Sequence, residues 1–191
     1  SEIFSNVIKR NHNAQSVEIG DITNKEFIQK TYNEIIEELD KFVGIDEVKQ
    51  SIEKIISKLD TDRLLLGTNS KREIRDHFLF LGNPGTGKTT IARIFADILN
   101  SLELLPVGQL IEVTRKDLVA EFVGQTAIKV DNVVQRAMGG VLFIDEAYSI
   151  IKDENDSFGK EAVDTLLKLI EDNRGKMVAI AAGYTKEMAD F

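Results

Sequence analysis

The sequence has no cysteine and only two histidines, His12 and His77. Without a thiol, the chain cannot form disulfide bridges, thiolate metal sites or a cysteine nucleophile, and an intracellular origin fits this composition. Two histidines so far apart also supply too few ligands for a typical zinc site. We expect both of them to be surface or strand-end residues.

Long apolar runs are also missing. None approaches the about 18 residues that a membrane-spanning helix needs, and the opening SEIFSNVIKR lacks the apolar core of a signal peptide. Basic residues are in the minority, 24 against 32 acidic ones, which gives a net charge of −8. This charge offers no electrostatic support for binding to nucleic acid or to an anionic membrane surface. The sequence therefore predicts a soluble cytoplasmic protein with no nucleic-acid or membrane partner.

The chain does have enough apolar material for one core, because 42% of its 191 residues are hydrophobic. Residues 1–32 predict a partly helical N-terminal extension, and we assign residues 33–191 to the main domain. Apolar residues three to four apart predict helices over 24–39 and 46–66. The first of these helices either packs on its own domain or binds a partner.

From residue 77 on, short apolar runs alternate with helical periods. The predicted strands cover residues 77–81, 109–113, 141–144 and 177–181, and the predicted helices cover 88–99, 127–138 and 158–171. Strands that alternate with helices of this length indicate a parallel sheet with helices on both faces. The expected fold class is therefore α/β.

The segment Gly82–Thr89, GNPGTGKT, matches the phosphate-loop pattern G-x-x-x-x-G-K-[ST] between a predicted strand and a predicted helix. Its glycines allow backbone N–H groups to turn toward phosphate oxygens, and Lys88 offers a mobile charge to the β- and γ-phosphates. Thr89 can ligate Mg²⁺, and Thr90 is placed to help hold the α-phosphate. The candidate nucleotide contacts of this loop are Asn83, Pro84, Gly85, Thr86, Gly87, Lys88, Thr89 and Thr90. The alternative, a plain Gly-Pro turn with a solvated Lys88, is disfavoured by the correct flanks.

Two carboxylates follow the predicted strand 141–144, at Asp145 and Glu146. In a parallel sheet the carboxyl ends of the strands share one edge, so Asp145 is expected beside the phosphate loop, where it would bind Mg²⁺ directly or through water. Glu146 can then polarise an attacking water and accept its proton, which favours hydrolysis over transfer to a hydroxyl. Lys88 and Glu146 are the catalytic candidates, and Thr89 and Asp145 are the metal ligands. The alternative is a strand end with two solvated acids.

Several further phrases accompany these motifs: FVGIDEVK at 42–49, HFLF at 77–80, VAEFVGQTA at 119–127, AVDTLLKLIEDN at 162–173 and AGY at 182–184. Together they resemble the CbxX/CfxQ family of AAA+ ATPases over roughly residues 33–191, with the sporulation members of that family the most similar. The resemblance implies a P-loop NTPase fold that binds ATP or ADP with Mg²⁺ in a bacterial cytoplasm. It also implies that Val43 and Gly44 lie against the adenine.

The same resemblance implies a ring-shaped homo-oligomer, as a hexamer, that works on a protein substrate. Phe122 would then lie in a loop that lines the central pore and grips a polypeptide. Because the chain ends at Phe191, we expect the next helix, a fifth strand, the arginine finger and the helical lid of the family to be absent from it. The isolated chain is therefore expected to bind nucleotide as a monomer and to turn over slowly.

Several other polar residues are not assigned a role in nucleotide binding or catalysis. Tyr184 stands where related ATPases usually have an asparagine that orients water, and its role is left open. Arg115 and Arg136 are expected to be surface residues, and the run KDEND at 152–156 is expected to be a solvated loop. None of these residues is assigned to catalysis.

The leading hypothesis is thus the ATP-hydrolysing core of a AAA+ protein-remodelling motor. One alternative is a nucleotide-dependent interaction module that switches partners without threading a substrate. A P-loop small-molecule kinase is a further alternative, although no insert for an acceptor pocket is evident.

Overall fold

The computed structural model describes residues 34–37, 49–55, 57 and 74–190. Residues 34–37, 49–55 and 57 are helical, which agrees with the helices predicted over 24–39 and 46–66 as far as these are described. The rest of both helices, the extension over 1–32, and the residues His12, Val43 and Gly44 lie outside the described residues.

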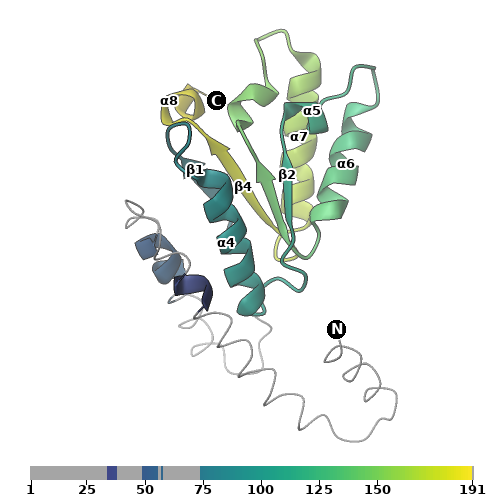
Figure 1. Ribbon diagram of the computed structural model, residues 1–191. Helices are drawn as coiled ribbons and strands as arrows, with labels where there is room; N and C mark the ends of the chain where they lie inside the picture. Colours follow the sequence, from purple (N-terminus) through teal and green to yellow (C-terminus); the bar gives the residue numbers. More distant parts are fainter. Residues whose placement is uncertain (1–33, 38–48, 56, 58–73, 191) are drawn as a thin grey trace, which may run out of the picture.

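Four parallel strands form a single sheet in the order β1-β4-β3-β2 (Figure 1). They are β1 (Phe78–Leu81), β2 (Leu110–Val113), β3 (Val141–Ile144) and β4 (Val178–Gly183). The helices that alternate with them are α4 (Lys88–Ser101), α6 (Thr126–Ala137) and α7 (Ser157–Asp172). All four predicted strands and all three predicted helices are therefore confirmed, and so is the parallel α/β fold.

Helices cover both faces of the sheet because alternate residues of its strands enter two separate cores. In β3, Val141 and Phe143 join the cluster formed with α4, whereas Leu142 and Ile144 join the cluster formed with α6 and α7. All four β3 residues are buried, as the uninterrupted apolar run VLFI predicts for a strand covered on both sides. This strand carries the acid pair at its carboxyl end.

The helical residues upstream of the sheet pack on the same domain. Ile52 is buried in the cluster around α4, and Ile35, Ile36 and Ile55 pack against that cluster. Packing on its own domain is therefore the better of the two interpretations of the first predicted helix, for the part that the structure describes. No helix among the described residues is long and apolar enough to cross a bilayer.

Three short elements were not predicted: α5 (Arg115–Leu118), the 3₁₀ helix η1 (Ala147–Ile150) and α8 (Thr185–Asp190). The expectation that the chain stops before a next helix was wrong, because α8 follows β4 after a single residue. α5 is stabilised at its start by Asp117, whose carboxylate accepts hydrogen bonds from the backbone N–H and the hydroxyl of Thr114. Elements of four to six residues are too short to show a hydrophobic period, so periodicity could not find them.

Candidate functional site

The strand register brings the motifs of the sequence to one edge of the sheet. Leu81 pairs with Gly183 across β1 and β4, and Ile144 pairs with Ala181 across β3 and β4. The backbone N–H of Gly82 donates to the carbonyl of Gly183 at 3.2 Å, so the pairing continues into the phosphate loop. The predicted meeting of this loop with the acid pair at one edge is therefore confirmed.

The phosphate loop leads directly into the N-terminus of α4. Gly85 and Gly87 have φ angles of +74° and +80°, a left-handed conformation that favours glycine, and Gly87 is the N-cap of the helix. Both the backbone N–H and the hydroxyl of Thr86 donate to the carbonyl of Asn83, which closes the turn. The loop thus lies at the positive end of a 14-residue helix, the kind of position that favours an anion.

Lys88 is anchored within the loop. Its Nζ donates to the carbonyls of Gly82 at 2.9 Å and Asn83 at 3.1 Å, and lies 5.1 Å from the centroid of the Tyr184 ring. Lys88 is therefore not a solvated side chain, as the alternative of a plain Gly-Pro turn would require. Thr89 is half-buried beside Lys88, and Thr90 is exposed on the same first turn.

The acid pair turns sharply at the end of β3. Asp145 is half-buried, and its Oδ1 accepts a hydrogen bond from the backbone N–H of Glu146 at 3.0 Å. Glu146 is exposed and has φ +48° and ψ 48°, a left-handed conformation that costs a residue other than glycine of order 1–3 kcal/mol. Backbone strain of this kind is typical of functional positions.

Oxygen ligands suitable for Mg²⁺ come from two elements, the hydroxyl of Thr89 and the carboxylate of Asp145. The described residues contain no group of three or more His, Asp or Glu side chains that could hold a metal by themselves. Mg²⁺ usually binds one or two protein oxygens and takes its other ligands from water and substrate phosphates. This donor set therefore fits a metal that arrives with a nucleotide.

Two tyrosines complete the site, and only one of them was singled out in the sequence. The Tyr184 hydroxyl donates to Oε1 of Glu146 at 3.4 Å, and its ring lies 5.6 Å from the ring of Tyr148 in η1. Burial, together with the negative charge of Glu146, raises the pKa of Tyr148 to about 12. Tyr148 was missed; its place two residues after the acid pair is the only signal of it in the sequence.

Comparison of the sequence with known protein families identifies the family of this domain. Residues 78–190 match the family described as "ATPase family associated with various cellular activities (AAA)". The chain belongs to this AAA family. The matched residues include the phosphate loop and the acid pair, so the site described above lies within the AAA ATPase domain.

Curated relatives narrow the resemblance of this AAA domain to the CbxX/CfxQ type. It is 41% identical over 160 residues to stage V sporulation protein K of Bacillus subtilis, covering 83% of this chain and 49% of the relative. It is 45% identical over 170 residues to the chloroplastic ribulose bisphosphate carboxylase/oxygenase activase of Cyanidioschyzon merolae, covering 87% and 58%. It is also 45% identical over 171 residues to a CfxQ homolog of Guillardia theta, covering 87% and 58%. The chain thus spans about half to three fifths of these relatives, and the predicted resemblance is confirmed.

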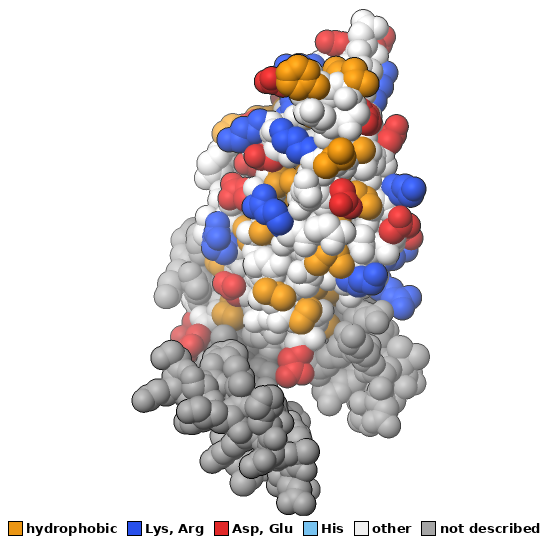
Figure 2. All heavy atoms as spheres, turned by 90° about the vertical axis from the view of Figure 1, so that its right-hand side faces the viewer, with side chains coloured by type: hydrophobic (Ala, Val, Ile, Leu, Met, Phe, Trp, Pro, Cys, Tyr) orange, Lys and Arg blue, Asp and Glu red, His pale blue; other side chains and the backbone are white. Residues whose placement is uncertain are grey.

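The AAA domain exposes two adjacent apolar residues after the carboxyl end of β2 and the short helix α5. Phe122 is 65% exposed and Val123 is 89% exposed in the loop between α5 and α6. Other exposed large apolar residues are Leu79, Leu81, Val107, Ile128 and Leu167. On the face shown in Figure 2, basic and acidic side chains are interspersed, with apolar side chains among them. Phe122 is therefore not packed in the core.

Of two expectations about charged residues, the one for Arg115 was wrong and the one for residues 152–156 holds in part. Arg115 does not lie free on the surface, because its Nη1 pairs with Oδ2 of Asp156 at 2.6 Å and also donates to the carbonyl of Ile150. Residues 152–155 are exposed, as expected of a solvated loop. Asp156 is the exception, because it is half-buried, is the N-cap of α7 and accepts a hydrogen bond from the backbone N–H of Gly159. Arg136 is exposed, as expected.

His77 lies at the start of β1, the strand-end position expected of it. Its Nδ1 accepts a hydrogen bond from the backbone N–H of Ala179 at 3.1 Å, so the unprotonated ring takes part in the pairing of β1 with β4. Burial, followed by the positive charge of Arg174, lowers the pKa of His77. The neutral imidazole is thus the form that this contact requires.

Proposed function

We propose that this chain is the ATP-hydrolysing core of a AAA+ protein-remodelling motor. The observation that carries the proposal is the position of Lys88 in the phosphate loop and Glu146 after β3 at the same edge of one parallel sheet. A phosphate loop alone serves many nucleotide-binding proteins, but a second carboxylate at this edge is suited to activating water. Hydrolysis, rather than transfer to another acceptor, follows from that carboxylate.

Each residue of the site has a distinct role in this proposal. The backbone N–H groups of residues 85–88, together with the Lys88 ammonium, hold the β- and γ-phosphates, and Thr90 assists at the α-phosphate. Thr89 and Asp145 would hold Mg²⁺, which when bound neutralises charge on the phosphate oxygens. Glu146 orients the attacking water and accepts its proton, while Tyr184 holds the Glu146 carboxylate.

The domain boundaries and the adenine contact are part of the same proposal. We assign residues 33–191 to the nucleotide-binding unit and residues 1–32 to an extension of it. Val43 and Gly44 would contact the adenine on the strength of the family resemblance. The bacterial cytoplasm is the proposed location because one relative is a sporulation protein of Bacillus subtilis, whereas the chloroplastic relative marks the alternative.

A protein substrate is proposed because of the exposed loop that carries Phe122. A large aromatic with 65% of its surface in water is suited to contact another molecule. The relative named as an activase of ribulose bisphosphate carboxylase/oxygenase acts on a protein, which supports the same class of partner. In the complete protein this loop would line the pore of a homo-oligomeric ring, proposed as a hexamer.

Nucleotide binding and phosphate release test the proposal directly. Lys88→Ala should lose binding of a fluorescent ADP analogue, whereas Glu146→Gln should keep it and lose phosphate release from Mg-ATP. Lys168→Ala, which removes an exposed lysine of α7, is the matched control and should change neither measurement. Unchanged phosphate release in Glu146→Gln would overturn the assignment of the base.

Two further measurements separate the alternatives. Phosphate release in the absence of any acceptor distinguishes hydrolysis from a small-molecule kinase. Phe122→Ala should abolish remodelling of a protein substrate by the assembled ring while nucleotide binding stays intact. Full remodelling by this variant would favour a nucleotide-dependent switch over a threading motor.

A further inference from the structure

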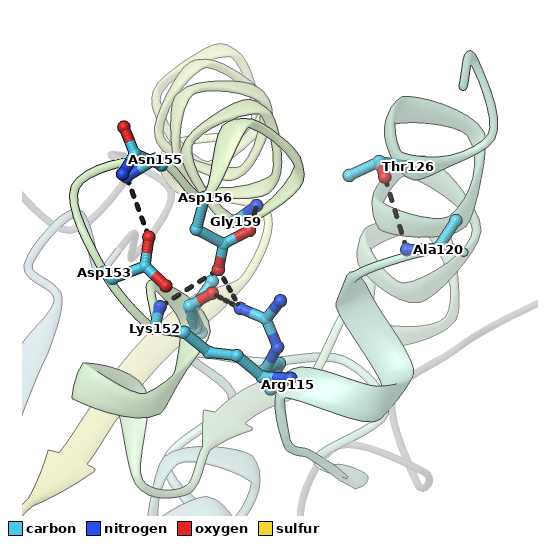
Figure 3. A network of polar contacts seen from close by, with 9 residues as sticks. Arg115, Ala120, Thr126, Lys152, Asp153, Asn155, Asp156 and Gly159 are labelled. Carbon is cyan, nitrogen blue, oxygen red and sulfur yellow. Dashed lines mark hydrogen bonds and ion pairs between the residues drawn. The ribbon is translucent and has the colours of Figure 1, made fainter. Parts of the chain in front are cut away.

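One half-buried ion pair connects two segments that lie far apart in the sequence. Arg115, the first residue of α5, pairs with Asp156 at 2.6 Å, and the side chains are 21% and 8% exposed (Figure 3). The same Nη1 atom donates to the carbonyl of Ile150, the last residue of η1. A single nitrogen thus fixes both ends of the segment between η1 and α7 to the start of α5.

On one side, this contact reaches the acid pair of the nucleotide site. η1 begins at Ala147, directly after Glu146, and ends at Ile150, which accepts the hydrogen bond from Arg115. Only one 3₁₀ turn therefore separates the proposed base from the contact. A change in the backbone of Glu146, which holds a strained left-handed conformation, has a short path to Arg115.

On the other side, the contact reaches the exposed loop that carries Phe122 and Val123. Lys129 in α6 donates from Nζ to the carbonyls of Lys116 and Val119, and the Thr126 hydroxyl accepts a hydrogen bond from the backbone N–H of Ala120. These contacts, of which the last is shown in Figure 3, tie α5 and the first two residues of the loop, Val119 and Ala120, to α6. The loop and α5 are thus connected through fixed contacts.

Further hydrogen bonds hold Asp156, the acidic member of the ion pair, in position. Asp156 also accepts hydrogen bonds from the backbone N–H groups of Lys152 at 3.0 Å and Gly159 at 2.9 Å. The hydrogen bond from Arg115 and these two backbone contacts hold the pKa of the Asp156 carboxyl well below its usual range, so it stays ionised. A charged pair with all its partners in place has one preferred geometry, which suits it to transmit a displacement.

We propose that Arg115 is a positioning residue that couples the conformation of the Glu146 segment to the position of the Phe122–Val123 loop through Asp156 and the carbonyl of Ile150. The inference rests on the proposed function, because it assumes that nucleotide changes the Glu146 segment. It adds to that function a defined mechanical connection within one subunit. Neither Arg115 nor Asp156 contacts the phosphate loop in this connection.

Because the chain has no cysteine, introduced cysteines are the only sites to which a thiol-reactive spin label can attach. Val123→Cys and Lys176→Cys provide two exposed sites for spin labels, one in the loop and one in the turn before β4. Double electron–electron resonance then measures the label distance without nucleotide, with Mg-ADP and with Mg²⁺ and a non-hydrolysable ATP analogue. We expect a nucleotide-dependent shift that is lost in Arg115→Gln and Asp156→Asn, and regained at least in part in Arg115→Lys.

Controls separate coupling from stability. In Asp156→Asn the one remaining side-chain oxygen can still accept the hydrogen bond from the backbone N–H of Gly159 that caps α7. Asp156→Asn and Arg115→Lys therefore carry the test if Arg115→Gln does not fold. Arg93→Gln, which removes the exposed pair with Glu112 at 3.9 Å, should leave the shift unchanged. A lower midpoint of thermal unfolding with an unchanged shift would show that the pair is only structural, and would overturn the inference.

A fluorescent ADP analogue, measured on the same labelled proteins, separates the two proposals. No binding in the unmodified background would overturn the proposed function itself. Binding without any change in label distance would leave the proposed function standing and overturn the coupling through Arg115.

Discussion

The hydroxyl of Tyr184 donates a hydrogen bond to Oε1 of Glu146 at 3.4 Å, across the carboxyl edges of β4 and β3. The same ring lies 5.1 Å from Nζ of Lys88. One aromatic side chain therefore contacts both residues to which we assign catalysis. Asparagine, the usual residue at this position in related ATPases, has a polar end but no ring to contact a lysine.

Removing only the hydroxyl tests the first of these contacts. In Tyr184→Phe the ring beside Lys88 remains, and Glu146 loses one hydrogen-bond donor. A hydrogen bond contributes about 1 kcal/mol, so we expect kcat for ATP hydrolysis to fall about fivefold while KM stays the same. Steady-state phosphate release checks this. A change in KM alone would show that Tyr184 acts through nucleotide binding instead.

Gly87, one of the two left-handed glycines of the phosphate loop, offers a second test. In Gly87→Ala the added Cβ meets no atom within 4 Å, so the substitution costs only backbone strain, about 1 kcal/mol of the free energy of unfolding. We expect weaker nucleotide binding as well, because the backbone N–H groups turn away from the phosphates. Gly124→Ala is a matched control, since φ there is +79° and its Cβ is equally unobstructed.

Both glycine variants should lower the free energy of unfolding in urea by similar amounts. Only Gly87→Ala should lower the affinity for ADP in a binding titration. Equal affinity in the two variants would argue against a phosphate-binding role for the loop.

Metal dependence gives a third prediction. Asp145 and Thr89 supply the oxygens proposed for Mg²⁺, so addition of EDTA should weaken ADP binding by the unmodified chain. Asp145→Asn lacks the charge that attracts the cation and should bind ADP with the same affinity in Mg²⁺ and in EDTA. Isothermal titration under both conditions measures the difference, and a Mg²⁺ effect that persists in the variant would exclude Asp145 as a ligand.

His77 makes the stability of the fold sensitive to mild acid. Burial lowers its pKa in the folded chain below the ordinary value of 6.5, whereas the unfolded chain keeps that value. Above pH 6.5 neither state holds the proton, so this contribution to stability is fully present. As the pH falls below 6.5 the unfolded state takes up the proton first, and the free energy of unfolding decreases.

The comparison with His77→Gln isolates this effect from other titrating groups. Urea unfolding at pH 7.5 and pH 5.5 should show a larger loss of stability in the unmodified chain than in the variant. An equal loss in both would mean that the hydrogen bond from Ala179 to Nδ1 does not depend on the neutral ring.

Sequence alone was sufficient where the signal is local. The run VLFI followed by Asp145 and Glu146 predicts a buried strand with an acid pair at its end, and the phosphate-loop pattern depends on eight consecutive residues. Both signals are set by covalent neighbours, and the parallel fold then brings the two motifs to one edge. The strands and this part of the site were predictable for that reason.

The remaining features depend on contacts between distant parts of the chain. Nothing near Arg115 indicates that it pairs with Asp156, and nothing near Tyr184 shows that its ring lies between Lys88 and Glu146. Such contacts are selected by packing rather than by propensity, so a single sequence carries no period or pattern for them. The adenine contact at Val43 and Gly44 stays a prediction, since both lie outside the described residues.

The central position of β4 has a consequence for how the site can vary. β4 lies between β1, which leads into the phosphate loop, and β3, which leads into the acid pair. A strand can shift against its neighbours only in whole residues, and a slip by one residue would turn buried side chains to the opposite face. The spacing between the two halves of the site is therefore discrete. We therefore expect a substitution in β4 either to keep the spacing between the phosphate loop and the acid pair or to destroy the site, without intermediate spacings.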